Sequence, residues 1–258
     1  MITSAQNSKI QQVRALLNRR RDREAAALFI AEGVRLVEEA WQAGLRPEML
    51  FYSRDLSPRG QQIVEDYRSH EVDVEEVLPS LMESLTQTET SQGLLAVFPL
   101  QSRPLPAHPG FIIIADNLRD PGNLGTILRS AAAARVDAVL LTPGTTDAFA
   151  PKVLRAGMGA HFRLPILEVA WREIRAYAPP PLKLFLAEAA APGFTCWNLD
   201  LRQPLALIIG GEAEGASPEA RAAADQSISI PMPGSSESLN AAVAAGILIF
   251  EVVRQRSS

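Results

Sequence analysis

The second half of the chain carries the pattern that most limits its possible folds, because short apolar segments alternate there with helix-like segments. Three of the apolar runs, FIIIA at 111–115, AVLL at 138–141 and LALII at 205–209, contain no polar side chain. A strand that is apolar on both faces must be covered on both faces, as in parallel sheets with helices on each side. The alternation therefore predicts an α/β layer fold built on a parallel sheet.

The expected elements of this half follow from the same pattern. Strands are expected at residues 111–115, 137–141, 164–169, 183–187, 205–209 and 227–230. Helices are expected at residues 124–134, 151–158, 171–177, 218–224 and 240–253. The last helix follows a polar loop after a strand that Pro231 and Pro233 interrupt, since proline cannot donate to a sheet ladder.

A proline-rich segment, PLQSRPLPAHPG at 99–110, separates this half from a smaller α/β region. Such composition is typical of an extended linker. We therefore predict one domain at 1–98, a linker at 99–110 and a second domain at 111–258. In the first domain, strands are expected at 27–30, 49–52, 72–74 and 94–98, and helices at 10–23, 33–43, 60–69 and 80–85.

Composition narrows the class of protein. Hydrophobic residues make up 47% of the chain and charged residues 21%, as in ordinary globular proteins. No apolar run has membrane length and the first residues lack an apolar signal core, so we expect a cytoplasmic protein without a membrane segment. Cys196, the one cysteine, is expected to be a small buried hydrophobe. The three histidines are scattered, and no metal site is expected.

Positive charge is concentrated near the N-terminus. Six cations and two anions give residues 1–30 a net charge of +4, while the whole chain carries −4. A basic segment on an acidic protein favours contact with phosphate groups, and Arg19, Arg20 and Arg21 are the candidates. Lys152 and Arg155 are candidates for the same role. The alternative for both groups is an ordinary solvated helix face.

Three polar loops follow expected strands of the second half. They are DNLRDPGN at 116–123, GGEAEG at 210–215 and the loop that ends at Asn240. Ligands of α/β proteins bind at the carboxyl ends of strands, so we expect a site there. Asn123 is expected to cap the helix that carries Arg129. The glycine loop lacks the lysine of a phosphate-binding Walker loop, and it is a weak dinucleotide fingerprint.

With these loops in order, the chain resembles the TrmH/SpoU family of RNA ribose 2′-O-methyltransferases of the SPOUT superfamily. The resemblance rests on NLRDPGNLGTILRSA at 117–131, IIGGEAEG at 208–215 and ISIPMPGSSESLN at 228–240. The first domain resembles the family's L30e-like RNA substrate-binding domain, through FIAEGVRLVEEA at 29–40 and TSQGLLAV at 90–97. Arg35 in the former segment is a further candidate for RNA binding.

The resemblance implies a small L30e-like α/β domain followed by a SPOUT α/β domain with a mostly parallel sheet and a deep trefoil knot. It implies S-adenosylmethionine as methyl donor and a homodimer formed through the knotted domain. The cofactor-binding residues implied are Gly210, Ile230 and Leu239, with Ala187, Glu188, Thr142 and Gly215 as further candidates. The catalytic residues implied are Arg129 together with Asn123, Glu212, Ser238 and Asn240.

The role of Arg129 stays open between two possibilities. A guanidinium keeps its proton at neutral pH, so it is an awkward general base. It can instead orient the ribose 2′-oxygen or bind phosphate while the hydroxyl proton leaves. Base methylation through a cysteine nucleophile is not expected, because Cys196 lies outside all three motifs.

The substrate favoured by the first domain is 23S ribosomal RNA. The alternatives are a transfer RNA 2′-O-methyltransferase and a non-catalytic RNA-binding protein of the same fold. A nucleotide-dependent oxidoreductase or kinase would need a glycine fingerprint after its first strand, and DNLRDPGNLG is not one. The chain departs from the family pattern at Arg135, where glycine commonly ends the helix, and at Gly157, where serine is more usual.

Overall fold

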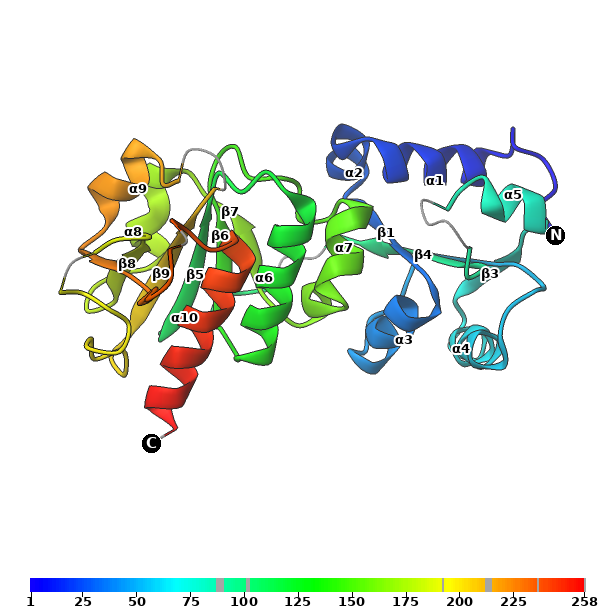
Figure 1. The fold of residues 1–258 in the computed structure, drawn as a ribbon. Helices are drawn as coiled ribbons and strands as arrows, with labels where there is room; N and C mark the ends of the chain where they lie inside the picture. Colours follow the sequence, from blue (N-terminus) through cyan, green and yellow to red (C-terminus); the bar gives the residue numbers. More distant parts are fainter. Residues whose placement is uncertain (87–90, 101–102, 192, 212–214, 236, 258) are drawn as a thin grey trace. The chain divides into compact units, whose positions relative to one another are not determined.

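The computed structural model describes residues 1–86, 91–100, 103–191, 193–211, 215–235 and 237–257. The chain forms two compact units (Figure 1). Unit 1 comprises Met1–Gln101 and Phe149–Phe162, and unit 2 comprises Ser102–Ala148 and Arg163–Ser258. The sequence pattern did not indicate that residues 149–162 would pack with the N-terminal region.

Unit 1 is built on a four-stranded mixed sheet. Its strands are β1 (Leu28–Glu32), β2 (Met49–Tyr52), β3 (Asp73–Glu76) and β4 (Leu94–Pro99), in the order β1-β4-β2-β3. β4 is antiparallel to β1 and β2, and β3 is parallel to β2. Successive residues of β1 pack into different cores, Phe29 into one and Ile30 into the other, so both faces of the sheet are covered.

Helices of unit 1 supply these two cores. The first core includes residues of α3 (Val34–Gln42), α4 (Pro58–Arg68), α7 (Pro151–Gly157) and the short 3₁₀ turn η1 (Ala160–Phe162). The second includes residues of α1 (Ser8–Asn18) and α5 (Pro79–Glu83). Phe149 and Phe162 carry the later segment into the first core, because their rings lie 5.1 and 6.3 Å from that of Phe29.

The expected single helix at 10–23 is wrong in one respect, because the structure has two helices there. Arg19 is extended, with φ −130° and ψ 123°, between α1 and α2 (Arg20–Ala26). Arg23 is buried, and its Nη1 donates to the carbonyl oxygen of Leu16 at 2.6 Å. This bond ties α2 back onto the end of α1, and it makes Arg23 a structural residue rather than a surface cation.

Unit 2 confirms the predicted α/β fold with a parallel sheet. Its six strands run in the order β10-β8-β9-β5-β6-β7, and every pair is parallel. The strands are β5 (Phe111–Asp116), β6 (Ala138–Leu141), β7 (Ile166–Glu168), β8 (Lys183–Ala187), β9 (Leu205–Gly210) and β10 (Gln226–Ile228). The runs without polar residues, on β5, β6 and β9, form the central part of this sheet, as burial on both faces requires.

Helices of unit 2 cover the sheet. Residues of α8 (Ile174–Tyr177), with the preceding 3₁₀ turn η2 (Trp171–Glu173), and of α9 (Pro218–Ala223) share one core with the strands. α6 (Pro121–Ala133) and α10 (Ala241–Arg256) pack against each other (Figure 1). The two helices are close at Gly246 of α10, because a Cβ added there would lie 4.0 Å from the Ser130 hydroxyl of α6, in ordinary van der Waals contact.

The two ends of α6 are well defined, and the first corrects the expectation drawn from sequence. Asp120, not Asn123, is the N-cap of α6, because its carboxylate accepts from the backbone N of Asn123 at 2.8 Å and Pro121 occupies the first turn. At the other end, Arg135 adopts the left-handed conformation with φ 54°. An arginine thus takes the conformation that glycine commonly supplies at this position.

Candidate functional site

Two of the three expected loops, the glycine loop after β9 and the loop that ends at Asn240, meet at a cavity in unit 2 of about 570 Å³. The described residues of the loop at 116–123 are not among those that line it. Loops after β8 and β9 form part of its wall, and the segment from β10 to the first turns of α10 forms the rest. The described lining residues are Ala187, Glu188, Ala189, Ala190, Ile209, Gly210, Gly211, Gly215, Ala216, Arg221, Ile228, Ile230, Met232, Ser238, Leu239, Asn240, Ala241, Ala244 and Leu248. Of the expected cofactor residues, Gly210, Ile230, Leu239, Ala187, Glu188 and Gly215 are thus brought together.

The glycine loop returns tightly on itself beside this cavity. A Cβ added to Gly210 would lie 2.7 Å from the backbone N of Ala216 and 2.8 Å from the carbonyl carbon of Gly215. A Cβ on Gly211 would lie 2.5 Å from the carbonyl oxygen of Asn117. Because these neighbours are backbone atoms, any side chain at either position would displace the loop.

Asp116 is a functional candidate that sequence reasoning missed. It ends β5, is fully buried, and accepts from the backbone N and the hydroxyl of Ser217 at 2.7 and 3.0 Å. The Thr142 hydroxyl donates to it at 3.1 Å. This carboxylate therefore joins the ends of β5 and β6 to the N-cap of α9, just after the glycine loop. A polar residue that ends an apolar strand was the available signal.

Thr142 is not among the residues that line the cavity. Its side chain is buried, and its hydroxyl is used by Asp116 and by the carbonyl oxygen of Ala115 at 3.3 Å. The structure thus gives Thr142 a supporting position beneath the loops, and places it apart from the other expected cofactor residues.

Asn123 and Asn240 lie together, as expected of neighbouring site residues. The Asn240 Nδ2 donates to the Asn123 Oδ1 at 3.0 Å. The Asn240 Oδ1 accepts from the backbone N of Ala242 and of Val243, so Asn240 is also the N-cap of α10. This pair joins the starts of α6 and α10 at the edge of the cavity. Ser238 lines the cavity two residues earlier.

Arg129 is exposed on α6 and is not among the residues that line the cavity. Within the described part of the chain its guanidinium forms no ion pair. An exposed guanidinium close in sequence to Asn123 can be reached by a ligand that approaches from outside. Glu212, the remaining expected catalytic residue, lies outside the described residues.

Of the two charged side chains that line the cavity in the described part of the chain, Glu188 was expected there and Arg221 was not. Glu188, after β8, forms an ion pair with Arg221 of α9, and the Ser227 hydroxyl of β10 donates to its Oε2 at 2.5 Å. Burial alone would raise the pKa of Glu188, but the hydrogen bonds from Ser227 and Arg221 outweigh it and lower the pKa below its usual value. The carboxylate is therefore ionised at neutral pH.

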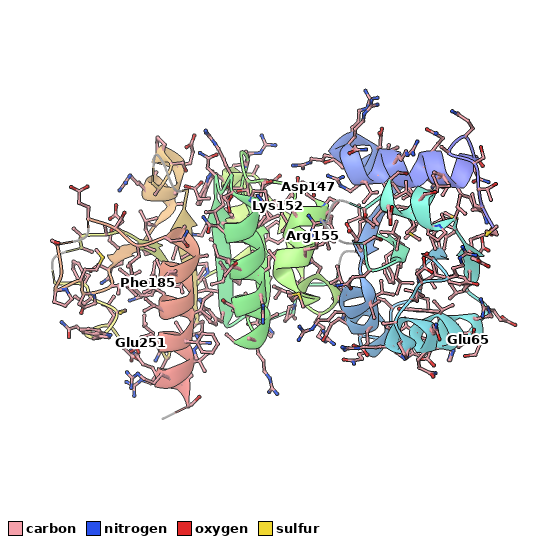
Figure 2. The ribbon with its side chains drawn as sticks, turned by 45° about the vertical axis from the view of Figure 1, so that its right-hand side comes forward. Glu65, Asp147, Lys152, Arg155, Phe185 and Glu251 are labelled. Carbon is pink, nitrogen blue, oxygen red and sulfur yellow. The ribbon has the colours of Figure 1, made fainter. Side chains whose placement is uncertain are left out.

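The expected RNA-binding residues of unit 1 differ in their surroundings. Arg19, Arg21, Arg35 and Lys152 are exposed, whereas Arg20 is ion-paired with Glu24. Lys152 and Arg155 both project from α7 (Figure 2). The Arg155 Nη1 lies 3.2 Å from the Oε2 of Glu32, a carboxylate that is only 4% exposed. Arg155 thus neutralises a buried charge and fixes α7 to the end of β1.

Cys196 is fully buried, as expected, and burial raises the pKa of its thiol. Among the described residues no group of histidine, cysteine, aspartate and glutamate side chains is arranged to hold a metal ion. The described helices include none that is long and apolar enough to cross a membrane.

Comparisons with known proteins agree with this arrangement of domains and loops. The model of the SpoU rRNA Methylase family matches residues 110–250, and that of the MRM3-like substrate binding domain matches residues 7–96. The human mitochondrial rRNA methyltransferase 3 is 32% identical, over 96% of this chain and 72% of its own length. The Bacillus subtilis 23S rRNA (guanosine(2553)-2′-O)-methyltransferase is also 32% identical, over 97% of this chain and 98% of its own.

Among solved structures, the SpoU methyltransferase AviRb from Streptomyces viridochromogenes, in complex with AdoMet, is similar throughout. It has a TM-score of 0.85 and 32% sequence identity, with 98% of this chain and 99% of that chain covered. The matches include both the substrate-binding and the methylase regions, in the same order as units 1 and 2 present them. The protein therefore belongs to the SpoU rRNA methylase family of S-adenosylmethionine-dependent methyltransferases.

Proposed function

We propose that this enzyme transfers a methyl group from S-adenosylmethionine to a ribose 2′-hydroxyl of 23S ribosomal RNA, in the cytoplasm. The observation that carries the proposal is the cavity lined by the second and third motif segments. The Asn123–Asn240 hydrogen bond connects this cavity to the start of α6, the helix of Arg129. Cofactor loops and the expected catalytic helix are thereby parts of one site.

The cavity suits the cofactor. Ile209, Ile228 and Leu248 supply apolar surface for an adenine ring, and the loop at Gly210 exposes backbone where a side chain would intrude. Ala187, Gly210, Ile230 and Leu239 would hold the nucleoside. S-adenosylmethionine supplies a methyl group that is already activated on a sulfonium, so the protein's main tasks are to align the hydroxyl and to assist loss of its proton.

For Arg129 we propose an orienting role. Its guanidinium keeps its proton at neutral pH and presents five donors, which suits a ribose oxygen or the adjacent phosphate. Ser238 and Asn240, at the cavity edge, and Glu212 of the glycine loop are proposed to position the reacting groups. The exposed Arg19, Arg21, Arg35 and Lys152 are proposed to contact the RNA backbone.

Ribosomal RNA is favoured over transfer RNA by unit 1. Both relatives described above act on ribosomal RNA according to their names, and they match this chain through its substrate-binding region as well as its methylase region. A mapping of 2′-O-methylation across total RNA, in a strain with and without the gene, tests the proposal. We expect one 23S position to lose its methyl group, whereas loss confined to transfer RNA would contradict the ribosomal assignment.

A methylation assay with purified components distinguishes the proposed enzyme from a non-catalytic RNA-binding protein of the same fold. The protein, S-adenosylmethionine with a labelled methyl group, and 23S RNA from the deletion strain should give stoichiometric labelling of the RNA. Ribose-specific labelling would be confirmed by its resistance to alkaline cleavage on the 3′ side. RNA binding without any labelling would favour the non-catalytic alternative.

A homodimer is proposed from an exposed apolar stripe on and before α10. Leu239, Val243, Ile247 and Phe250 are spaced by three or four residues, and 37 to 51% of each is exposed. Such spacing places Val243, Ile247 and Phe250 on one face of α10, with Leu239 just before the helix. A face of this kind is typical of helix–helix interfaces between subunits. The trefoil knot stays a prediction of the family resemblance.

A further inference from the structure

No group of the cofactor has yet been assigned to the charged part of the cavity. Among the described lining residues, Glu188 and Arg221 are the charged ones, and they are paired with each other. Glu188 directly follows β8 and Arg221 belongs to α9, and Ser227 of β10 donates to the same carboxylate. Three elements thus hold one ionised side chain, 23% exposed, in the cavity wall.

The carboxylate of Glu188 can still accept hydrogen bonds. Two carboxylate oxygens together offer about four lone-pair sites. In the structure Arg221 donates to Oε1 and Ser227 donates to Oε2. Each oxygen therefore keeps capacity for one further donor, and an ionised acceptor forms stronger hydrogen bonds than a neutral one.

Two groups of S-adenosylmethionine could use this acceptor, namely the ribose hydroxyls and the ammonium of the methionine part. Arg221 offsets most of the charge of Glu188 at long range, so an ammonium would gain little from approaching the pair. Neutral hydroxyls are not repelled by Arg221 and still gain a charge-assisted hydrogen bond at short range. The pairing thus favours the hydroxyls.

We propose that Glu188 binds the ribose diol of the cofactor, with Arg221 and Ser227 holding its carboxylate in place. An acidic side chain after a parallel strand is a known solution for ribose hydroxyls in other α/β proteins. The sheet order agrees, because β8 lies on the side of β9 away from β5, and α6 with Arg129 follows β5. Glu188 therefore lies across β9 from the strand that leads to Arg129, which fits a role in binding the cofactor rather than in methyl transfer.

Calorimetric titration of the full-length protein tests this role with three ligands. S-adenosylhomocysteine carries both groups, 5′-methylthioadenosine lacks the amino acid, and the 2′-deoxy analogue of S-adenosylhomocysteine lacks one hydroxyl. For Glu188→Ala we expect affinity for the first two ligands to fall by the same factor, roughly tenfold or more. The wild type should bind the 2′-deoxy ligand more weakly than S-adenosylhomocysteine, and the variant should not distinguish them.

Two further variants complete the test. Glu188→Gln is isosteric and keeps one acceptor oxygen, so its losses should be intermediate. Glu219→Gln removes an exposed carboxylate of α9 that does not line the cavity, and it should bind all three ligands as the wild type does. Unfolding temperatures without ligand show whether each variant is folded.

Two outcomes would overturn the proposal. A loss for S-adenosylhomocysteine but not for 5′-methylthioadenosine would assign Glu188 to the amino acid. An equal loss for all three ligands in a folded variant would make the residue merely structural. The inference rests on the cofactor and not on the proposed RNA target. Because the titrations need no RNA, they decide the role of Glu188 even if 23S RNA is not the substrate.

Discussion

At the scale of single residues, the site combines buried, hydrogen-bonded side chains with exposed ones. Asp116 is buried and holds three hydrogen bonds, whereas Arg129 is exposed and unpaired within the described part of the chain. A buried, fully bonded carboxylate stabilises the loops around the cavity, because leaving its donors unsatisfied would be costly. An exposed guanidinium contributes little to stability and can be reached by a substrate.

Replacement of Arg129 by alanine is expected to separate catalysis from cofactor binding. Loss of one preorganised donor to the reacting oxygen typically lowers turnover by roughly 10² to 10³-fold. Affinity for S-adenosylhomocysteine should change by less than about threefold, since Arg129 does not line the cavity. Single-turnover methylation of 23S RNA and calorimetry give the two quantities. Retained turnover would remove Arg129 from the catalytic residues.

At the scale of elements, the ends of helices and strands carry most of what the site needs. α10 begins at an asparagine that both caps the helix and bonds to α6, and the glycine loop follows β9 directly. The N-cap of α10 therefore also ties the start of α6 to the start of α10. Changes at these ends test the connection between local conformation and binding.

Gly210→Ala is expected to abolish most cofactor binding. The added Cβ would lie 2.7 Å from the backbone N of Ala216, and backbone cannot move aside as a flexible side chain can. We expect affinity for S-adenosylhomocysteine to fall on the order of tenfold or more as the loop shifts. Gly234→Ala is the matched control, because nothing lies within 4 Å of its added Cβ. Equal binding by both variants would contradict the assigned role of the loop.

Arg135→Gly is expected to stabilise the protein. Arg135 is exposed and has φ 54°, a conformation that costs a non-glycine residue about 1 kcal/mol or more. Glycine removes this cost but gains freedom in the unfolded chain, so the free energy of unfolding should rise by roughly 0.5 kcal/mol. Urea denaturation measures the change. Arg135→Ala keeps the left-handed strain and should leave stability nearly unaltered.

At the scale of the whole molecule, the two units divide the proposed work. Unit 2 contains the cofactor cavity, and unit 1 contains the region that matches a substrate-binding domain. The apolar stripe of α10 belongs to unit 2, so the proposed dimer would be formed by the unit that binds the cofactor. In Figure 2, Glu251 marks the same helix.

Charged substitutions in this stripe test the dimer. Val243→Glu and Phe250→Glu each place a charge at an exposed apolar position of α10. If the face is an interface, each variant should have the mass of one chain in light scattering at micromolar concentration, where the wild type has the mass of two. Ala222→Glu, on an exposed position of α9, should leave the mass unchanged. A monomeric wild type would contradict the proposal.

The sequence by itself determined the α/β class, the parallel sheet and the segments that form the site. Strands such as β5 and β9 can be recognised from the local sequence, because a strand that is buried on both faces is a continuous run of apolar residues. The motifs around Asn123, Gly210 and Asn240 identified the family for a similar reason. Each requires particular residues where backbone and ligand come close, and the comparisons confirm that identification.

Only the tertiary structure decided which of these residues touch. It placed residues 149–162 with unit 1, paired Arg155 with the buried Glu32, and set Thr142 beneath the loops instead of in the cavity. It also revealed Asp116 and the Glu188–Arg221 pair. The physical reason is that the role of a charged side chain depends on which groups surround it. Those groups are distant in sequence, and a local pattern of polar and apolar residues does not reveal them.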